Sequence, residues 1–149
     1  NPVEDIYSES DCPFEMDKAT WLQGRGKTVK AALIACGEMV HPALEAAEIL
    51  EQAGIAASVL DMYCVKPLDS EAVIEAAKAS DIVVTVEEHS PYGGLGAMVA
   101  QVVSEYCPRK VKCLSLPDAP VITGTSPEVF AHYGLTGEGI AAVVEEILK

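Results

Sequence analysis

The stretch DIVVTVEEHSPYGGLG, residues 81–96, holds the turn from a strand to a helix that decides the fold. Residues 82–86 are apolar and mostly β-branched, which is typical of a central strand in a parallel sheet. A polar loop follows, and the glycines at its end lead into a segment from about 97 to 106 that is expected to be helical. A buried strand followed by a loop and a helix is the repeating unit of an open α/β fold.

The same alternation continues toward the N-terminus. An apolar run at 29–36 predicts a buried strand, and the helical period of 39–53 predicts a helix that ends at Gly54. Residues 57–62 form the next apolar run, and Asp69 stands where it can cap a second helix. Two further strand–helix units therefore precede the central strand.

The alternation also continues toward the C-terminus. Residues 111–116 predict the fourth strand of the series. Ser126 is expected to cap a short helix that has a proline at its first position and ends at Gly134. Thr136 is expected to cap the last helix, which has an apolar stripe on one face.

This pattern predicts a three-layer α/β/α fold with a mostly parallel five-stranded sheet. The weak alternation of Phe14 to Leu22 predicts an antiparallel N-terminal edge strand, and Gly24 to Gly26 would allow a tight hairpin from it into Val29. Residues 1–13 are expected to be an extended linker, and residues 14–149 a single domain.

Composition restricts the function classes. Half of the 149 residues are apolar, which is enough for one core without disulfides or a structural metal. The formal net charge of −13 argues against binding to nucleic acid or to anionic lipid, because both would be repelled. The acidic start has no apolar stretch behind it, so no signal peptide is expected, and no run approaches the about 20 apolar residues of a membrane helix. Since the chain does not begin with Met, it is expected to be a piece of a longer polypeptide.

The cysteines indicate a reducing compartment. Their number is odd, and no two of them form a C-x-x-C pair. They are expected to be buried, reduced thiols of a cytoplasmic protein and to form neither a zinc site nor a disulfide framework. The five are Cys12, Cys36, Cys64, Cys107 and Cys113.

The loop from Glu87 to Gly96 is the candidate site, because it joins the C-terminal end of a strand to the start of a helix. Ligands of open α/β sheets bind at such places, and a helix start attracts anions. The candidate residues for an interdomain or ligand contact are Glu87, Glu88, His89, Tyr92, Gly93, Gly94 and Gly96.

Known chemistry fits this loop poorly. A dinucleotide fingerprint that starts at Gly94 fails at its third glycine position, which is Val99. Glu87 and Glu88 could be paired carboxylates, but neighbouring residues at a strand end point to opposite sides. His89 could carry a proton. The alternative, which we favour, is a polar loop whose groups hold one another or contact a partner.

Elsewhere the sequence offers no convincing catalytic set. His41 lies on the polar face of its helix and is expected to be exposed, and His132 lies near a helix end. The histidines lack metal-ligand spacing, and neither a G-x-S-x-G elbow nor a P-loop occurs. We therefore assign no catalytic, cofactor-binding or metal-binding residue to this chain and expect it to assist chemistry carried out elsewhere.

Several short segments are shared, in order, with one known family: Phe14-Glu15, Gly26-Lys27, residues 37–40 and 43–47, residues 60–63 and 65–69, residues 85–90 and 93–96, residues 133–136, and Gly139-Ile140. Together they resemble the C-terminal domain of the transketolase family of thiamine-diphosphate enzymes. The chain is most similar to the C-terminal half of a split, two-subunit transketolase. The 1-deoxyxylulose-5-phosphate synthases are close behind, and the beta subunit of the pyruvate dehydrogenase decarboxylase is more distant.

The resemblance implies a transferase that moves a two-carbon ketol unit between sugar phosphates. Thiamine diphosphate and Mg²⁺ would be held by other domains, since the metal-binding G-D-G…N pattern is absent here. This domain would pack on the pyrimidine-binding and diphosphate-binding domains or subunits of a homodimer and would be inactive alone. The loop from Glu87 to Gly96 would pack at that boundary, so a bulky residue in place of Gly94 should weaken assembly.

Two further readings stay open: a stand-alone module that binds a nucleotide or an acidic metabolite through this loop, and a pure assembly domain without a ligand.

Overall fold

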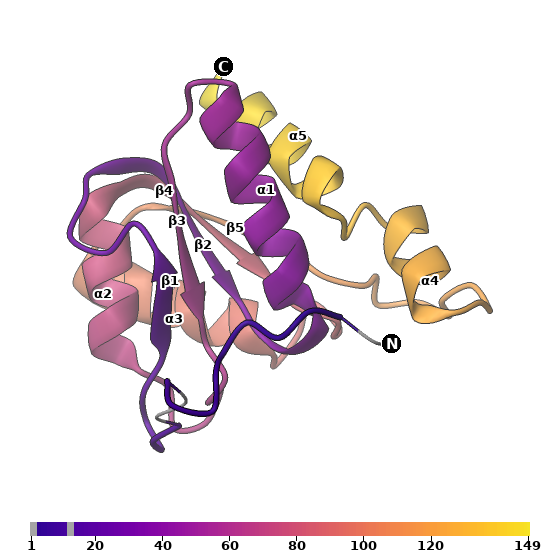
Figure 1. The fold of residues 1–149 in the computed structure, drawn as a ribbon, viewed down its shortest axis with the longest axis horizontal. Coiled ribbons are helices and arrows are strands. Elements are labelled where there is room, and N and C mark those ends of the chain that lie inside the picture. Colours follow the sequence, from indigo (N-terminus) through magenta and orange to yellow (C-terminus); the bar gives the residue numbers. More distant parts are fainter. Residues whose placement is uncertain (1–2, 12–13) are drawn as a thin grey trace.

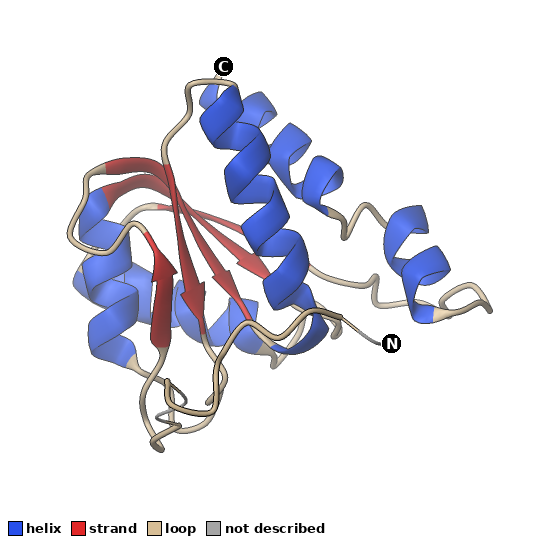
Figure 2. Cartoon of the chain, viewed as in Figure 1, coloured by secondary structure: helices blue, strands red, loops and turns tan. Residues whose placement is uncertain are grey.

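A five-stranded sheet crosses the middle of the molecule, with its strands in the order β1-β3-β2-β4-β5 and helices on both faces (Figures 1 and 2). The computed structural model describes residues 3–11 and 14–149. The strands are β1 (Thr20–Gln23), β2 (Val29–Ala35), β3 (Ala57–Asp61), β4 (Ser80–Val86) and β5 (Lys110–Leu114). The helices are η1 (Gly37–Met39), α1 (Val40–Gln52), α2 (Ser70–Ala79), α3 (Leu95–Tyr106), α4 (Ser126–His132) and α5 (Gly137–Leu148).

The expected fold class is confirmed. Strands β3, β2, β4 and β5 pair in parallel, and β1 is an antiparallel edge strand. Each central strand is buried on both faces, because alternate residues enter different cores. Leu33 of β2 packs with α1 and α5, while its neighbour Ile34 packs with α2 and α3. This alternation explains why β2 and β4 read as continuous apolar runs.

The prediction of a hairpin between the first strand and β2 was wrong. Strand β1 begins at Thr20 instead of Phe14, and it pairs with β3, where Thr20 lies beside Asp61. The glycine turn exists, since the Lys27 N–H donates to the Gly24 carbonyl at 3.2 Å. Both edges of β2 are already occupied by parallel partners, β3 and β4, so the turn carries the chain past β3.

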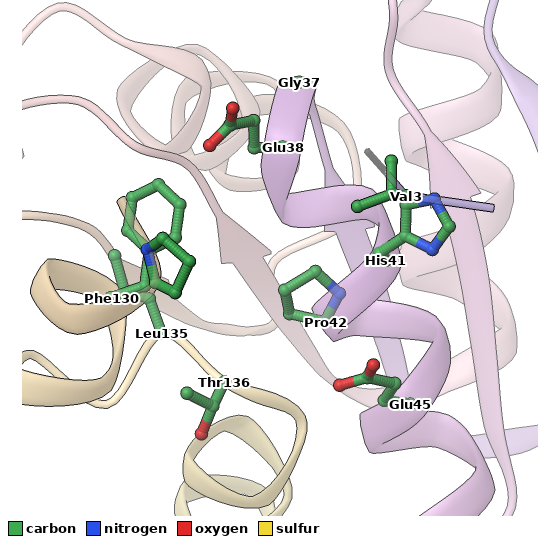
Figure 3. Close-up of a pocket in the computed structure, with 10 residues that line it drawn as sticks. Val3, Gly37, Glu38, His41, Pro42, Glu45, Phe130, Leu135 and Thr136 are labelled. Carbon is green, nitrogen blue, oxygen red and sulfur yellow. The ribbon is translucent and has the colours of Figure 1, made fainter. Parts of the chain in front are cut away.

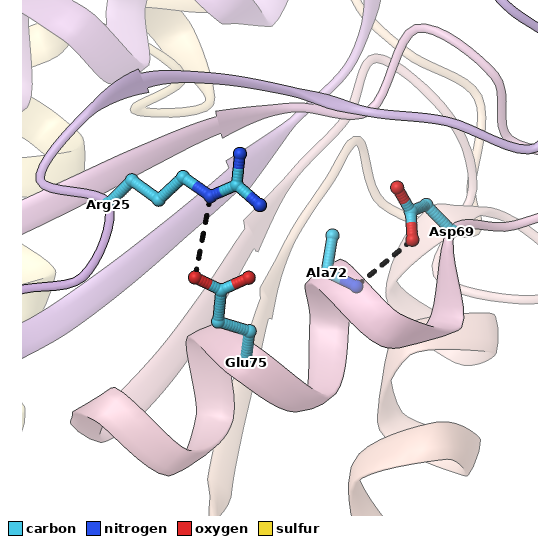
Figure 4. Close-up of polar contacts among 4 residues, drawn as sticks. All are labelled: Arg25, Asp69, Ala72 and Glu75. Carbon is cyan, nitrogen blue, oxygen red and sulfur yellow. Dashed lines mark hydrogen bonds and ion pairs between the residues drawn. The ribbon is translucent and has the colours of Figure 1, made fainter.

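Side chains cap the helices much as the sequence predicts. The Asp69 carboxylate accepts the N–H of Ala72 at 3.0 Å at the start of α2 (Figure 4), and Thr136 accepts the N–H of Gly139 at the start of α5. Helix α4 differs, because its N-cap is Thr125 and not Ser126. Thr125 is extended and donates its N–H to Glu128, which places Pro127 at the second helical position.

The helix α2 region also has an ion pair, between Arg25 and Glu75 at 3.5 Å (Figure 4). Both side chains are largely exposed, so this pair contributes little to stability.

The N-terminal segment lies against the domain. The side chain of Ile6 packs on the core beneath α1, and the Tyr7 hydroxyl donates to the Asp61 carboxylate at 2.6 Å. The Phe14 ring stands edge-on to both Tyr7 and Tyr63. Residues 3–11 form neither helix nor strand, and their service as a linker stays a prediction.

The cysteines are less buried than expected. Cys36, Cys64, Cys107 and Cys113 are free thiols, and each is half-buried. Cys12 lies outside the described residues. Within the described part of the chain, no helix has the length and apolar character needed to cross a membrane.

Candidate functional site

The candidate site lies where the connections from two adjacent strands diverge. Strands β2 and β4 are neighbours, but β2 continues into α1 on one face and β4 continues into α3 on the other. The carboxyl ends of such a strand pair mark the place where open α/β sheets bind ligands. In this chain the loops at that place are Cys36 to Glu38, after β2, and Glu87 to Gly94, after β4.

Glu87 fills the helix start that a ligand would use. Its side chain is only 3% exposed. One carboxylate oxygen accepts the N–H of Leu95 at 2.8 Å, and the other accepts the N–H of Gly96 at 2.7 Å. These are the first free donors of α3, the groups that bind phosphate in nucleotide sites. The domain therefore satisfies this anion site with its own carboxylate.

Two of the loop glycines allow close packing around that carboxylate. A Cβ on Gly94 would overlap an oxygen of Glu87 and would lie 2.6 Å from a ring carbon of His89. A Cβ on Gly96 would lie 2.8 Å from Cys113 Sγ and 2.8 Å from Thr85 Oγ1. A bulky residue at position 94 would therefore disturb the domain itself before it could report on assembly.

The remaining candidate residues point elsewhere. Glu88 lies toward the end of β2, with its Oε1 3.4 Å from where a Cβ on Gly37 would stand. His89 is exposed, and Tyr92 is 72% exposed. Gly93 has a φ of 74°, which suits a turn. The structure thus groups Glu87, His89, Gly94 and Gly96 and separates Glu88 and Tyr92 from them; the roles assigned to these residues stay predictions.

The electrostatics of this edge are unfavourable to anions and to a nucleophilic thiol. Burial raises the pKa of Cys36 to about 11, with further contributions from the charges of Glu87, Glu88 and Asp61. Partial burial and the nearby charge of Glu38 also raise the pKa of Glu88. Among the described residues, no group of three His, Cys, Asp or Glu side chains could hold a metal ion. The strand ends therefore do not fit thiamine diphosphate with its Mg²⁺.

Asp61, which the sequence analysis did not single out, gives a prediction about pH. Burial raises the pKa of Asp61 in the folded chain, although the bond from Tyr7 opposes this shift. The folded state then holds the proton more tightly than the unfolded state, so Asp61 lowers the free energy of unfolding as pH rises above about 4. Asp61→Asn should make that decline shallower between about pH 4 and about pH 7 in urea unfolding.

Asp81→Asn is the matched control for this measurement. The pKa of Asp81 is lowered by its hydrogen bond to Lys30 and by the Lys30 charge, so its contribution to stability is present above its unfolded pKa and is lost as pH falls. Its removal should change the slope with the opposite sign. An unchanged pH profile in Asp61→Asn would contradict the assignment.

A pocket of about 550 Å³ between α1 and α4 escaped the sequence analysis (Figure 3). His41 lines it and is half-buried, so the expectation that His41 is exposed was wrong. The helical period places His41 on the polar face of α1, but it cannot tell that α4 and the N-terminal segment come to lie over that face. The lining residues that matter below are Glu38, His41, Pro42, Glu45, Phe130 and Leu135.

The fold and the strand ends together define an open α/β domain whose ligand crevice is closed by its own side chains. The family described as "Transketolase, C-terminal domain" matches residues 22–140, and the chain belongs to that family. The resemblance found in the sequence is thereby confirmed. Enzymes of this family depend on thiamine diphosphate in general.

Individual relatives agree with this assignment. An apulose-4-phosphate transketolase polypeptide of Phocaeicola vulgatus, one part of a divided enzyme, is 45% identical over 148 residues, which cover 99% of this chain and 46% of that protein. The 1-deoxy-D-xylulose-5-phosphate synthase of Magnetococcus marinus is 41% identical over 133 residues, covering 84% of this chain and 21% of that protein. A solved structure titled "Split gene transketolase, inactive beta4 tetramer" matches with a TM-score of 0.86 and 39% identity, over 97% of this chain and 46% of that one. The chain thus spans less than half of the length of these relatives.

Proposed function

We propose that this chain is the C-terminal domain of a thiamine-diphosphate-dependent enzyme that transfers a two-carbon ketol unit between sugar phosphates. Its role is domain packing and subunit assembly, and it is not catalytic alone. Thiamine diphosphate and Mg²⁺ bind to the pyrimidine-binding and diphosphate-binding domains or subunits, which are its partners. The whole enzyme is a homodimer, and the free thiols of the described cysteines support a cytoplasmic location.

The observation that carries this proposal is the bond pattern of Glu87. An open α/β domain that binds nucleotides or sugar phosphates keeps the helix start after a central strand free for phosphate. Here both oxygens of a buried carboxylate occupy the N–H groups of Leu95 and Gly96. A second anion would have to displace a charge that the domain already holds. A domain built in this way supports a site located on its neighbours.

A split transketolase is favoured over a 1-deoxyxylulose-5-phosphate synthase. The match to the split-type relative extends over 99% of the chain, whereas the match to the synthase covers 84%. The longer match leaves room for the N-terminal segment, in which Tyr7 binds Asp61. The synthase stays the alternative, because its identity is nearly as high.

Product analysis tests the two enzymes against each other. The intact enzyme that contains this chain, assembled with its partner and supplied with thiamine diphosphate and Mg²⁺, should convert a ketose phosphate and an aldose phosphate into a new pair of sugar phosphates. The chain without its partner should give no turnover. Formation of 1-deoxyxylulose 5-phosphate would favour the synthase, and turnover by the chain without its partner would overturn the proposed role.

Calorimetry tests the third reading, a stand-alone binding module. The chain should take up no nucleotide from a panel of mono-, di- and triphosphates, because Glu87 holds the helix start. Tight binding of any member would favour the module instead.

A further inference from the structure

The pocket between α1 and α4 has stiff apolar walls. Pro42 stands in the first turn of α1, and Pro127 stands in the first turn of α4. The side chain of Phe130 forms another wall, and the buried Leu135 lines the pocket from the link between α4 and α5 (Figure 3). Proline fixes its backbone, so these walls lose little freedom when they are covered. The pocket is therefore largely formed in advance for an apolar side chain.

The rim of the pocket is acidic and lacks a basic counterpart. Glu38 and Glu45 line the pocket on either side of His41 along α1 (Figure 3). A neighbouring hollow shares His41 and Glu45, and neither hollow has a Lys or Arg among its described lining residues. The neighbouring hollow adds the carboxylates of Glu4, Asp5 and Glu48. None of these acids takes part in the two ion pairs of the described residues, which are Arg25–Glu75 and Lys30–Asp81.

The far wall of the pocket is itself incompletely packed. None of the residues of α4 is buried, and the helix lies at the edge of the molecule, away from the sheet (Figure 1). The loop before it exposes two large apolar side chains, Val121 at 44% and Ile122 at 39%. This loop is attached to the end of α4, because the Ile122 N–H donates to the Tyr133 hydroxyl at 3.2 Å. The pocket, α4 and the loop thus form one continuous surface with apolar and acidic character.

We propose that this surface is the docking site for a segment of the partner subunit that carries an apolar side chain next to an arginine or lysine. The apolar side chain enters the pocket between Pro42 and Phe130, and the basic group pairs with Glu38 and Glu45. The proposal rests on the proposed function, which requires such a partner. A second copy of this chain fits less well, because its formal net charge of −13 would oppose an acidic rim.

Charge reversal at the rim tests the proposal in the intact two-subunit enzyme. The double variant Glu38→Lys/Glu45→Lys should raise the dissociation constant of the subunits at least about tenfold at about 50 mM NaCl. For the unaltered enzyme the dissociation constant should rise between about 50 mM and about 300 mM NaCl, and the double variant should lose most of this salt dependence. Glu51→Lys is the matched control, since Glu51 is exposed on the same helix and does not line the pocket.

The outcomes separate the docking surface from the function. If the unaltered subunits associate and transfer ketol units while the double variant associates equally well, the docking surface is wrong and the function stands. If the unaltered subunits neither associate nor transfer ketol units, both fall. A lower melting temperature of the variant subunit alone, with an unchanged dissociation constant, would mean that its own preceding domain covers the pocket, which also overturns the proposal. Should the lysine variant fail to fold, Glu38→Gln/Glu45→Gln replaces it, with an expected loss of about threefold.

Discussion

Glu87→Ala is expected to lower the free energy of unfolding of the chain by about 2–4 kcal/mol. The substitution removes a buried carboxylate that accepts two N–H groups at the start of α3. Hydrogen bonds to a charged acceptor contribute about 1.5–3 kcal/mol each, and the two donors would be left buried without a partner. Urea unfolding followed by circular dichroism measures the loss.

Its neighbour provides the control for this experiment. Glu88 follows directly in sequence, but it is exposed and takes no part in capping α3. Glu88→Ala should therefore stay within about 0.5 kcal/mol of the unaltered chain. Glu87→Gln keeps one acceptor oxygen and should fall between the two alanine variants. If Glu87→Ala unfolds at the same urea concentration as Glu88→Ala, the carboxylate does not hold the helix.

Gly94→Ala is expected to lower the free energy of unfolding by about 1–3 kcal/mol, a large effect for one methyl group. The backbone at Gly94 has a φ of −94°, which any residue can adopt, so the cost is steric. The added Cβ would overlap the Glu87 carboxylate, which cannot move away without releasing the start of α3.

A double-mutant cycle identifies the cause. In the Glu87→Ala background the carboxylate is gone, so the Ala at position 94 should cost about 1 kcal/mol less than in the unaltered chain. Gly124→Ala serves as the control, because its Cβ would meet mainly the flexible side chains of Glu128 and Val129 at 3.3 Å or more. Additive losses at positions 87 and 94 would show that the two residues do not compete for this space.

Local signals in the sequence were sufficient for most of the fold. The β-branched run before Glu87 predicts the strand that became β4, and the caps at Asp69 and Thr136 lie where the residue types suggest. Such features depend on residues that are close in sequence. The partner of β1 does not: it is set by the insertion of β3 between β1 and β2, which no turn sequence can reveal.

The candidate site was predicted in place but not in function. The position of the loop after β4 follows from the order of strand and helix, so the sequence could locate it. That Glu87 turns inward and binds α3 depends on the conformation of seven intervening residues, and Glu–Gly patterns alone do not specify it. The environment of Asp61 and the half-buried state of His41 also depend on distant segments, namely Tyr7 for the former and α4 for the latter.

The carboxylate at the start of α3 also limits what this architecture could become. A descendant of the domain could acquire nucleotide binding only after the acid at position 87 was neutralised and the loop around Gly94 had opened, and the first of these changes would weaken the fold before any benefit appeared. Random substitution seldom passes through such a destabilised intermediate. The closed crevice thus restricts the domain to a scaffolding role and leaves innovation in substrate choice to the polypeptides around it.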